Sequence, residues 1–321
     1  MKKSLIALAA LAATASFAQS SVTISGSIST GLSKTGAAGS KAVVTNLGGG
    51  ANALNIVTVE DLGGGLKGGF DSQIRFLANS GDIGSSGDAT GTALFHGANA
   101  YVGGAFGTVR VGKIVEASNC AFDPWGCTGG ASLSGGLTGG TTGLVAASTT
   151  ANAVGYATPT IAGFSASYTT SVSTRTYERQ VLSLNYSNGP VAVQYLERQG
   201  GANVTTATGT AGADDNSKAR SIAGSYDFGV AKLSVGNTVN KAATTGATSG
   251  DITTVGVSVP MGVYTILAGY AKDKKQAAAT DTKTALGVNY ALSKRTTLGA
   301  DVFKDEKIGG NGYTLRVRHT F

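Results

Sequence analysis

The sequence predicts an all-β protein: a closed, antiparallel barrel of sixteen strands that crosses a membrane. Three observations support this prediction. The chain begins like an exported protein, and no later segment has the 18 or more apolar residues that mark a membrane-spanning helix. Stretches of alternating polar and apolar residues recur and often end in tyrosine. Short turns alternate with long polar connections along the whole chain.

Residues 1–18 have the layout of a cleaved secretory signal peptide. Lys2 and Lys3 precede an apolar run, and Ser16 and Ala18 supply small residues at the cleavage site. The run is about half as long as the roughly 20 apolar residues of a membrane-spanning helix, which argues against an uncleaved anchor. We expect residues 19–321 to form a single barrel domain.

The composition narrows the fold further. The chain contains 49 glycines, only four prolines, and 13% charged residues, with a net charge of +7. A helical protein would not tolerate this glycine content, which leaves disordered low-complexity chains and antiparallel β proteins. Regular alternation favours the β protein.

The clearest alternation is at the C-terminus. Apolar or aromatic side chains fall on one face of the last strand, and polar ones on the other. The first face carries Tyr313, Leu315, Val317, His319 and Phe321, and the second carries Thr314, Arg316, Arg318 and Thr320. A strand between lipid and water needs this pattern, although a soluble sandwich core would show it too.

The pattern recurs in five further segments. They are Leu182–Leu184–Tyr186, Val191–Val193–Tyr195, Ile222–Tyr226, Tyr264–Ile266–Ala268–Tyr270 and Leu286–Val288–Tyr290. Tyrosine at a strand end is typical of the aromatic girdle at the lipid–water boundary, whereas a sandwich core would place aromatic residues mid-strand.

The connections give the strand count. Seven short ones are rich in turn formers: 61–65, 104–107, 158–160, 187–190, 227–229, 260–262 and 292–295. Eight long polar ones lie near 34–50, 78–93, 116–150, 171–179, 199–217, 240–251, 272–282 and 304–311. Fifteen connections imply sixteen strands, enough to enclose an aqueous lumen. Closure requires the first strand, about 22–34, to pair with the last.

Four motifs, in order, resemble the general diffusion porins of Gram-negative bacteria, specifically the trimeric beta-proteobacterial type. They are Gln19-Ser-Ser-Val-Thr23, Glu60-Asp-Leu-Gly-Gly-Gly-Leu-Lys67, Ala100-Tyr-Val-Gly103 running into Phe106-Gly-Thr-Val109, and Arg318-His-Thr-Phe321. The resemblance covers essentially the whole chain. It implies an outer-membrane homotrimer whose third loop folds into each lumen as a constriction.

That loop corresponds here to about 116–150, and Asp123-Pro-Trp-Gly126 resembles the family's proline–aromatic–glycine bend. The family usually has an arginine seven residues before the glutamate of the first-turn motif and another three before the tyrosine of the Tyr-Val-Gly motif. This chain has Ala53 and Ala98 there. The thinner arginine cluster predicts weak rather than strong anion selectivity.

Three cations are candidates for the constriction wall. Arg75 lies between Ile74 and Phe76, and Arg110 lies between two valines, so alternation directs both inward. Lys113 occupies the position of a family arginine, but its parity is wrong for the lumen unless a bulge intervenes. Arg316 and Arg318 point inward closer to the periplasmic mouth. For each, a solvated charge without effect on selectivity is the alternative.

The loop also carries two candidate carboxylates and a cysteine pair. Glu116 and Asp123 either face the cationic wall and create a transverse field, or anchor the loop through hydrogen bonds. Cys120 and Cys127 lie close together in an exported chain, which predicts a disulfide. A metal site is disfavoured because His96 and His319 are isolated in the sequence.

The sequence offers no catalytic constellation, so we expect no enzymatic activity and no cofactor. The glycine clusters precede no helix that could bind phosphate, and the basic residues do not cluster with aromatic ones for nucleic acid. Lys272, Lys274 and Lys275 are instead candidates to face lipopolysaccharide phosphates.

We therefore expect a passive channel for small hydrophilic solutes and ions. The alternatives are a solute-specific channel, which saturable conductance would reveal, and a non-conducting structural or adhesin barrel; an outer-membrane hydrolase is a weaker third. The resemblance also implies that the barrel assembly machinery reads the terminal strand, so Phe321, with His319 and Tyr313, is the candidate assembly signal.

Overall fold

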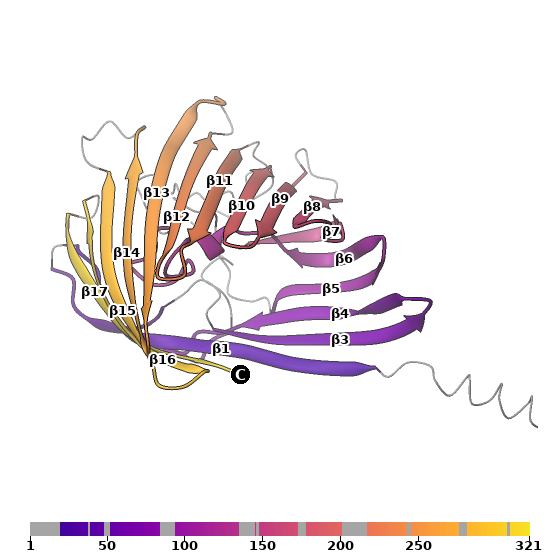
Figure 1. Cartoon of the computed structure of the whole chain (residues 1–321), viewed down its shortest axis with the longest axis horizontal. Helices are drawn as coiled ribbons and strands as arrows, with labels where there is room; N and C mark the ends of the chain where they lie inside the picture. The colour runs from indigo at the N-terminus through magenta and orange to yellow at the C-terminus, as the bar shows by residue number, and fades with distance from the viewer. Residues whose placement is uncertain are drawn as a thin grey trace, which may run out of the picture.

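The computed structural model describes residues 20–37, 39–47, 52–83, 94–134, 145, 148–172, 178–200, 217–242, 245–275, 281–306 and 309–321. The described strands form one antiparallel sheet (Figure 1). The sheet closes because its first strand, β1 (Ser21–Lys34), pairs with its last, β17 (Gly310–Thr320), which confirms the expected closure. In these ranges no helix is long and apolar enough to cross a membrane.

Seventeen named strands build sixteen wall positions. β1 pairs along its first half with β3 (Ala53–Gly63) and further along with β2 (Val43–Asn46). β3 and β2 pair with successive parts of β1, on the same side of it. Together they therefore count as one strand of the barrel wall. The predicted sixteen-stranded antiparallel barrel is thus confirmed. The long connection expected near 34–50 contains one short strand, β2, that the sequence did not predict.

The other strands follow as consecutive hairpins. They are β4 (Leu66–Arg75), β5 (Phe95–Gly104), β6 (Gly107–Val115), β7 (Thr149–Ala157), β8 (Phe164–Ser171), β9 (Gln180–Asn188), β10 (Val191–Gln199), β11 (Lys218–Asp227), β12 (Lys232–Lys241), β13 (Thr248–Met261), β14 (Tyr264–Asp273), β15 (Thr282–Ala291) and β16 (Thr296–Asp305). One short 3-10 helix, η1 (Cys120–Phe122), follows β6.

Every one of the seven predicted short turns joins two successive strands. At the other rim, β13 begins inside the stretch 240–251 that we expected to be loop. Residues 1–18, the predicted signal peptide, lie outside the described residues, as do parts of several long loops. The asymmetry of short turns on one rim and long loops on the other follows the predicted pattern.

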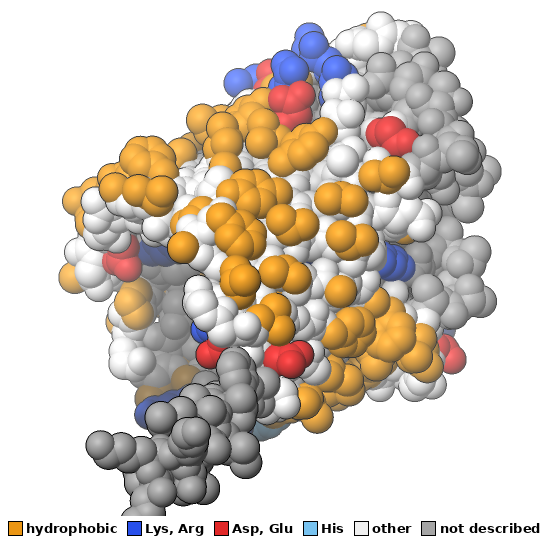
Figure 2. Space-filling model, turned by 90° about the vertical axis from the view of Figure 1, so that its right-hand side faces the viewer, with side chains coloured by type: hydrophobic (Ala, Val, Ile, Leu, Met, Phe, Trp, Pro, Cys, Tyr) orange, Lys and Arg blue, Asp and Glu red, His pale blue; other side chains and the backbone are white. Residues whose placement is uncertain are grey.

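The outer face of the barrel is apolar, as alternation predicted. Exposed side chains on it include Leu184, Val193, Ile222, Leu286 and Leu315. Figure 2 shows hydrophobic side chains spread over one side of the barrel, with charged ones mainly toward its edges.

Aromatic side chains gather near the short-turn rim. Phe164 packs on Tyr186 with ring centroids 4.5 Å apart, and Tyr264 packs on Tyr290 at 5.1 Å. All lie at strand ends beside short turns, where a girdle at the lipid–water boundary belongs.

The C-terminal residue seals the barrel at the same rim. Phe321 exchanges two backbone hydrogen bonds of 3.0 Å with Gly26 of β1. Its ring lies over that glycine, because a Cβ built there would approach the ring to 2.6 Å. Glycine therefore leaves the space that lets the terminal ring close the seam.

Candidate functional site

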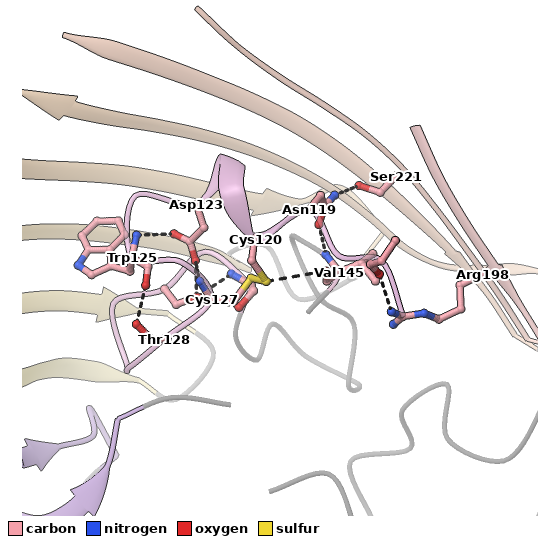
Figure 3. Close-up of a disulfide and its surroundings, with 12 residues drawn as sticks. Asn119, Cys120, Asp123, Trp125, Cys127, Thr128, Val145, Arg198 and Ser221 are labelled. Atoms are coloured by element: carbon pink, nitrogen blue, oxygen red, sulfur yellow. Dashed lines mark hydrogen bonds between the residues drawn. A yellow bond between two sulfur atoms is a disulfide. The ribbon is translucent and has the colours of Figure 1, made fainter. Parts of the chain in front are cut away.

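The first part of the loop between β6 and β7 lies inside the barrel. Its described residues, 116–134, 145 and 148, start beside β6 and contact inward-facing side chains of β10, β11, β13, β14, β15 and β16. Figure 3 shows this segment beneath the strands of the wall, around the disulfide. Three sets of contacts hold it there: at its base, at a central asparagine, and at its tip.

Glu116 fixes the base of the loop. Its carboxylate accepts hydrogen bonds of 2.8 Å from Nε and Nη2 of Arg179, and Arg198 Nε of β10 lies 2.7 Å from its Oε2. Thr150 Oγ1 of β7 donates a further hydrogen bond of 2.8 Å. The carboxylate is fully buried, so one negative charge binds two arginines at the long-loop end of the β9–β10 hairpin.

The electrostatics of this cluster keep Glu116 ionised. Burial acts to raise the pKa of its carboxyl, but the charges of Arg198 and Arg179 and the hydrogen bonds outweigh burial and bring the pKa to about 2. The folded pKa lies below the ordinary value, so this carboxylate stabilises the fold fully above about pH 4.5 and loses its contribution as the pH falls toward 2.

Asn119 braces the middle of the loop. Its Nδ2 donates a 2.5 Å hydrogen bond to Ser221 Oγ of β11, and its Oδ1 accepts one of 2.6 Å from the backbone of Val145 (Figure 3). The backbone N–H of Asn119 also donates to the carbonyl of Val145. One buried side chain therefore joins two segments of the loop to the wall.

Asp123 and the disulfide shape the tip. Cys120 and Cys127 are bonded, as predicted. Asp123 accepts hydrogen bonds from the backbone N–H groups of Trp125 and Cys127, at 3.1 and 2.9 Å, and one of 2.5 Å from Ser132 Oγ. Burial raises the pKa of this carboxyl, although these hydrogen bonds oppose the rise. Asp123 therefore organises the loop's own backbone.

Trp125 anchors the tip of the loop to the barrel wall at β16. Its Nε1 donates a 2.9 Å hydrogen bond to Asp301 Oδ1 of β16, whose other carboxylate oxygen pairs with Arg316 of β17. Trp125 also belongs to a buried apolar cluster with Phe122, Leu133 and residues of the wall. The indole thus combines a large apolar contact with a directional bond.

Glycines of the wall make room for this tip. A Cβ at Gly269 of β14 would come within 2.7 Å of the Trp125 ring and 2.9 Å of Leu133. One at Gly256 of β13 would come within 2.6 Å of Pro124. Gly256 and Gly269 are direct cross-strand partners. Together they form a glycine floor, a part of the wall without side chains, against which Pro124, Trp125 and Leu133 pack.

Charged side chains also lie on the inner face of β4 to β6. These strands are about half the barrel's circumference away from β13 to β16, which the loop tip contacts. Arg75 and Arg110 face inward there, as predicted: Arg75 Nε donates a 2.7 Å hydrogen bond to Gln73, and Arg110 pairs with Asp71 at 3.4 Å. The Arg110 guanidinium also lies over the ring of Tyr101. Arg110 and Asp71 are partly exposed, whereas Arg75 is buried beside a neutral partner.

Lys113 lies next to irregular backbone, which is the condition under which its side chain could face the lumen. The pairing of β6 with β7 shifts register between Gly112 and Ile114, and the pairing of β5 with β4 shifts beside His96. Lys113 Nζ donates a 3.1 Å hydrogen bond to the carbonyl of Phe95. Bulges of this kind are frequent at functional sites, where they redirect side chains.

The structure thus distributes the predicted site residues over two places. Arg75, Arg110 and Lys113 lie on the β4–β6 wall, while Glu116 and Asp123 are engaged within the loop, which favours the anchoring alternative for both. Tyr313, His319 and Phe321 lie along the last strand and its end. The described ranges contain no group of three or more residues suited to hold a metal ion.

Comparison with known proteins gives a family. A model of the Gram-negative porins matches residues 4–307. The outer membrane porin protein 32 of Delftia acidovorans is 32% identical over 329 residues, which cover 93% of this chain and 88% of the relative.

Solved structures agree with this match. An anion-selective porin from Comamonas acidovorans has a TM-score of 0.73 and 25% identity over 94% of this chain and 100% of that one. A loop-deletion mutant of OmpT, an outer membrane protein of Vibrio cholerae, has a TM-score of 0.66 at 14% identity, with 94% and 99% covered, and shows the shared fold alone.

Proposed function

The chain belongs to the Gram-negative porin family and is an outer-membrane porin, and from the charges around its loop we propose that its channel is weakly anion-selective. We further propose that it works as a homotrimer, that small hydrophilic solutes and ions diffuse through it passively, and that it catalyses no reaction. The loop at 116–150 sets the size limit.

The observation that carries the selectivity is the engagement of the loop carboxylates. Glu116 is bound between two arginines, and Asp123 is turned into the loop's own backbone. Neither leaves its charge free to oppose the cations across the lumen. On the wall, Asp71 compensates Arg110, but Arg75 has only the neutral Gln73 as its described partner. The remaining excess is positive.

The excess is small, which is why the expected preference is weak. The family's usual arginines are replaced by Ala53 and Ala98, and Ala53 is the cross-strand partner of Arg75. Charges within about one Debye length of a passing ion, roughly 8–10 Å in physiological salt, act almost unscreened. The wall charges should therefore outweigh loop charges at the mouth. The anion-selective relative supports the same sign.

Neutralising wall charges tests this proposal. We expect Arg75→Gln and Arg110→Gln each to move the zero-current potential toward cation preference, and Asp71→Asn to move it the other way. Each shift should grow in dilute salt, because screening weakens. Arg295→Gln, in an exposed short turn, is the matched control and should shift it little. If Arg75→Gln and Arg110→Gln behave like this control at low salt, the wall does not set selectivity.

Saturable conductance with one solute would instead favour a solute-specific channel, and silent bilayers would favour a structural barrel.

We also propose that lipopolysaccharide and the barrel assembly machinery are partners, the latter through the terminal strand. Phe321 supports this because its ring and backbone close the seam on Gly26.

Removing the last residue tests the assembly signal. Deletion of Phe321 removes two backbone hydrogen bonds at the seam and the terminal aromatic ring. We expect less heat-modifiable trimer in the outer membrane, measured by gel mobility of unheated extracts. Undiminished folded protein after this deletion would rule the signal out.

A further inference from the structure

An uncharged aromatic residue, Tyr101 of β5, lies on the inner face of the barrel between two of the wall strands. It is the direct cross-strand partner of Arg110 on β6 and of Gly69 on β4. The next residue along β5, Val102, and the residue before Arg110, Val109, are both exposed on the outer face. Alternation therefore places Tyr101 and Arg110 together on the inner face.

A gap in the backbone pairing fixes the position of the Tyr101 ring. The pairing of β3 with β4 is interrupted between Val57 and Glu60 of β3. In this gap the hydroxyl of Tyr101 donates a 2.9 Å hydrogen bond to the carbonyl of Thr58, across the intervening strand β4. A Cβ at Gly69 would collide with that carbonyl and come within 2.9 Å of the hydroxyl. Glycine on β4 therefore lets the tyrosine lie flat across the wall.

The guanidinium of Arg110 lies over this ring, with its Cζ 5.3 Å from the ring centroid. A cation and an aromatic face attract one another within about 6 Å. The ring carries no net charge, so it holds the cation without neutralising it. Because the ring extends over Gly69 and the guanidinium lies over the ring, the ring separates the positive charge from the backbone of the wall.

The ion pair between Arg110 and Asp71 is correspondingly loose. Its N–O distance of 3.4 Å is the longest among the ion pairs of the described residues. The same Nη1 also donates to Asn99 Oδ1 at 3.3 Å. By contrast, Glu116 binds its two arginines at 2.7 and 2.8 Å. Asp71 and Asn99 therefore orient the guanidinium without closing on it.

We propose that Tyr101 is a positioning residue for ion selectivity, whose ring holds the charge of Arg110 in the lumen. The role rests on the weak anion selectivity proposed above. Without the ring, the guanidinium settles toward the wall by about one carbon contact distance, roughly 3.5–4 Å, and closes on Asp71. The net charge of the protein is unchanged, but the positive charge lies farther from a passing anion and closer to a carboxylate, so it attracts the anion less.

Zero-current potentials in planar bilayers under a salt gradient test this role, because the substitution alters no charge. We expect Tyr101→Leu to move the potential toward cation preference, in the same direction as Arg110→Gln but by less. Tyr101→Phe keeps the ring and loses only the hydroxyl, so it should retain most of the original potential. In a protein that already carries Arg110→Gln, Tyr101→Leu should add no further shift, because the group through which it acts is absent.

Tyr156 of β7 is the matched control, because its hydroxyl also bonds to a backbone carbonyl, that of Phe106, but its side chain lies on the outer face. Tyr156→Leu should leave the potential unchanged. If Tyr101→Leu does not assemble, Tyr101→Met, which also lacks a ring, replaces it with the same expected shift.

Two results would overturn the positioning role alone. One is an unchanged potential in Tyr101→Leu while Arg110→Gln shifts it. The other is an equal shift by Tyr101→Leu with and without Arg110, which would show that the tyrosine acts elsewhere. If Arg110→Gln itself shifts nothing, the proposed selectivity of the wall fails at this arginine, and the positioning role fails with it.

Discussion

Glu116→Gln should release the base of the inward loop and cost about 3–5 kcal/mol, because removing one member of a buried ion pair leaves the other uncompensated. Here two arginines, Arg179 and Arg198, would lose the carboxylate that they share. We expect a lower thermal midpoint of the trimer and a larger, noisier single-channel conductance, as the loop leaves the wall. Planar bilayers and thermal melts measure both effects.

A matched variant separates loop anchoring from general loss of an ion pair. Glu197→Gln also removes a carboxylate paired with arginine, but that pair lies on the outer face, with Arg220 exposed and Glu197 partly exposed. We expect it to change neither conductance nor midpoint appreciably, since exposed pairs contribute little. If Glu116→Gln gives the same quiet, unaltered channel as Glu197→Gln, the base contact does not hold the loop.

The second large effect is expected at the tip. Trp125→Ala removes the indole from its glycine floor and its hydrogen bond to Asp301, and a buried tryptophan truncated to alanine typically costs about 3–5 kcal/mol. We expect faster protease cleavage within the loop and an altered conductance. Trp125→Phe keeps most of the packing and loses only the hydrogen bond to Asp301. Its rate of loop cleavage should therefore lie between those of the unaltered protein and Trp125→Ala. Cleavage of Trp125→Ala at the unaltered rate would contradict the anchor.

Most of the barrel could be predicted because its determinants are local. Alternation directed Arg75 and Arg110 inward without any knowledge of their partners, and turn formers located seven hairpins. The same rule would have placed Arg198 inward, two residues beyond the buried Leu196. β2 escaped prediction because its four residues are too few to show a period.

The interior of the site depends on contacts between distant segments. Arg179 lies before β9, outside any alternating run, and 63 residues from the carboxylate that it binds. Gly256 and Gly269 lie mid-strand, and their role in accommodating the loop tip depends on side chains more than 100 residues away in the sequence. Asn119 could not be predicted as a site residue from the sequence. Its role depends on hydrogen bonds to Ser221 and Val145, which lie far from it in the sequence.

Current through a planar bilayer under a salt gradient tests the central claim most directly. A water-filled channel with a positive excess at its constriction predicts stepwise conductance, in groups of three for a trimer, and a zero-current potential of the sign for weak anion preference. That potential should grow as both salt concentrations fall together at a fixed ratio, because screening weakens. Silent membranes would contradict the channel itself, and a potential of the opposite sign at low salt would contradict the assignment of its charges.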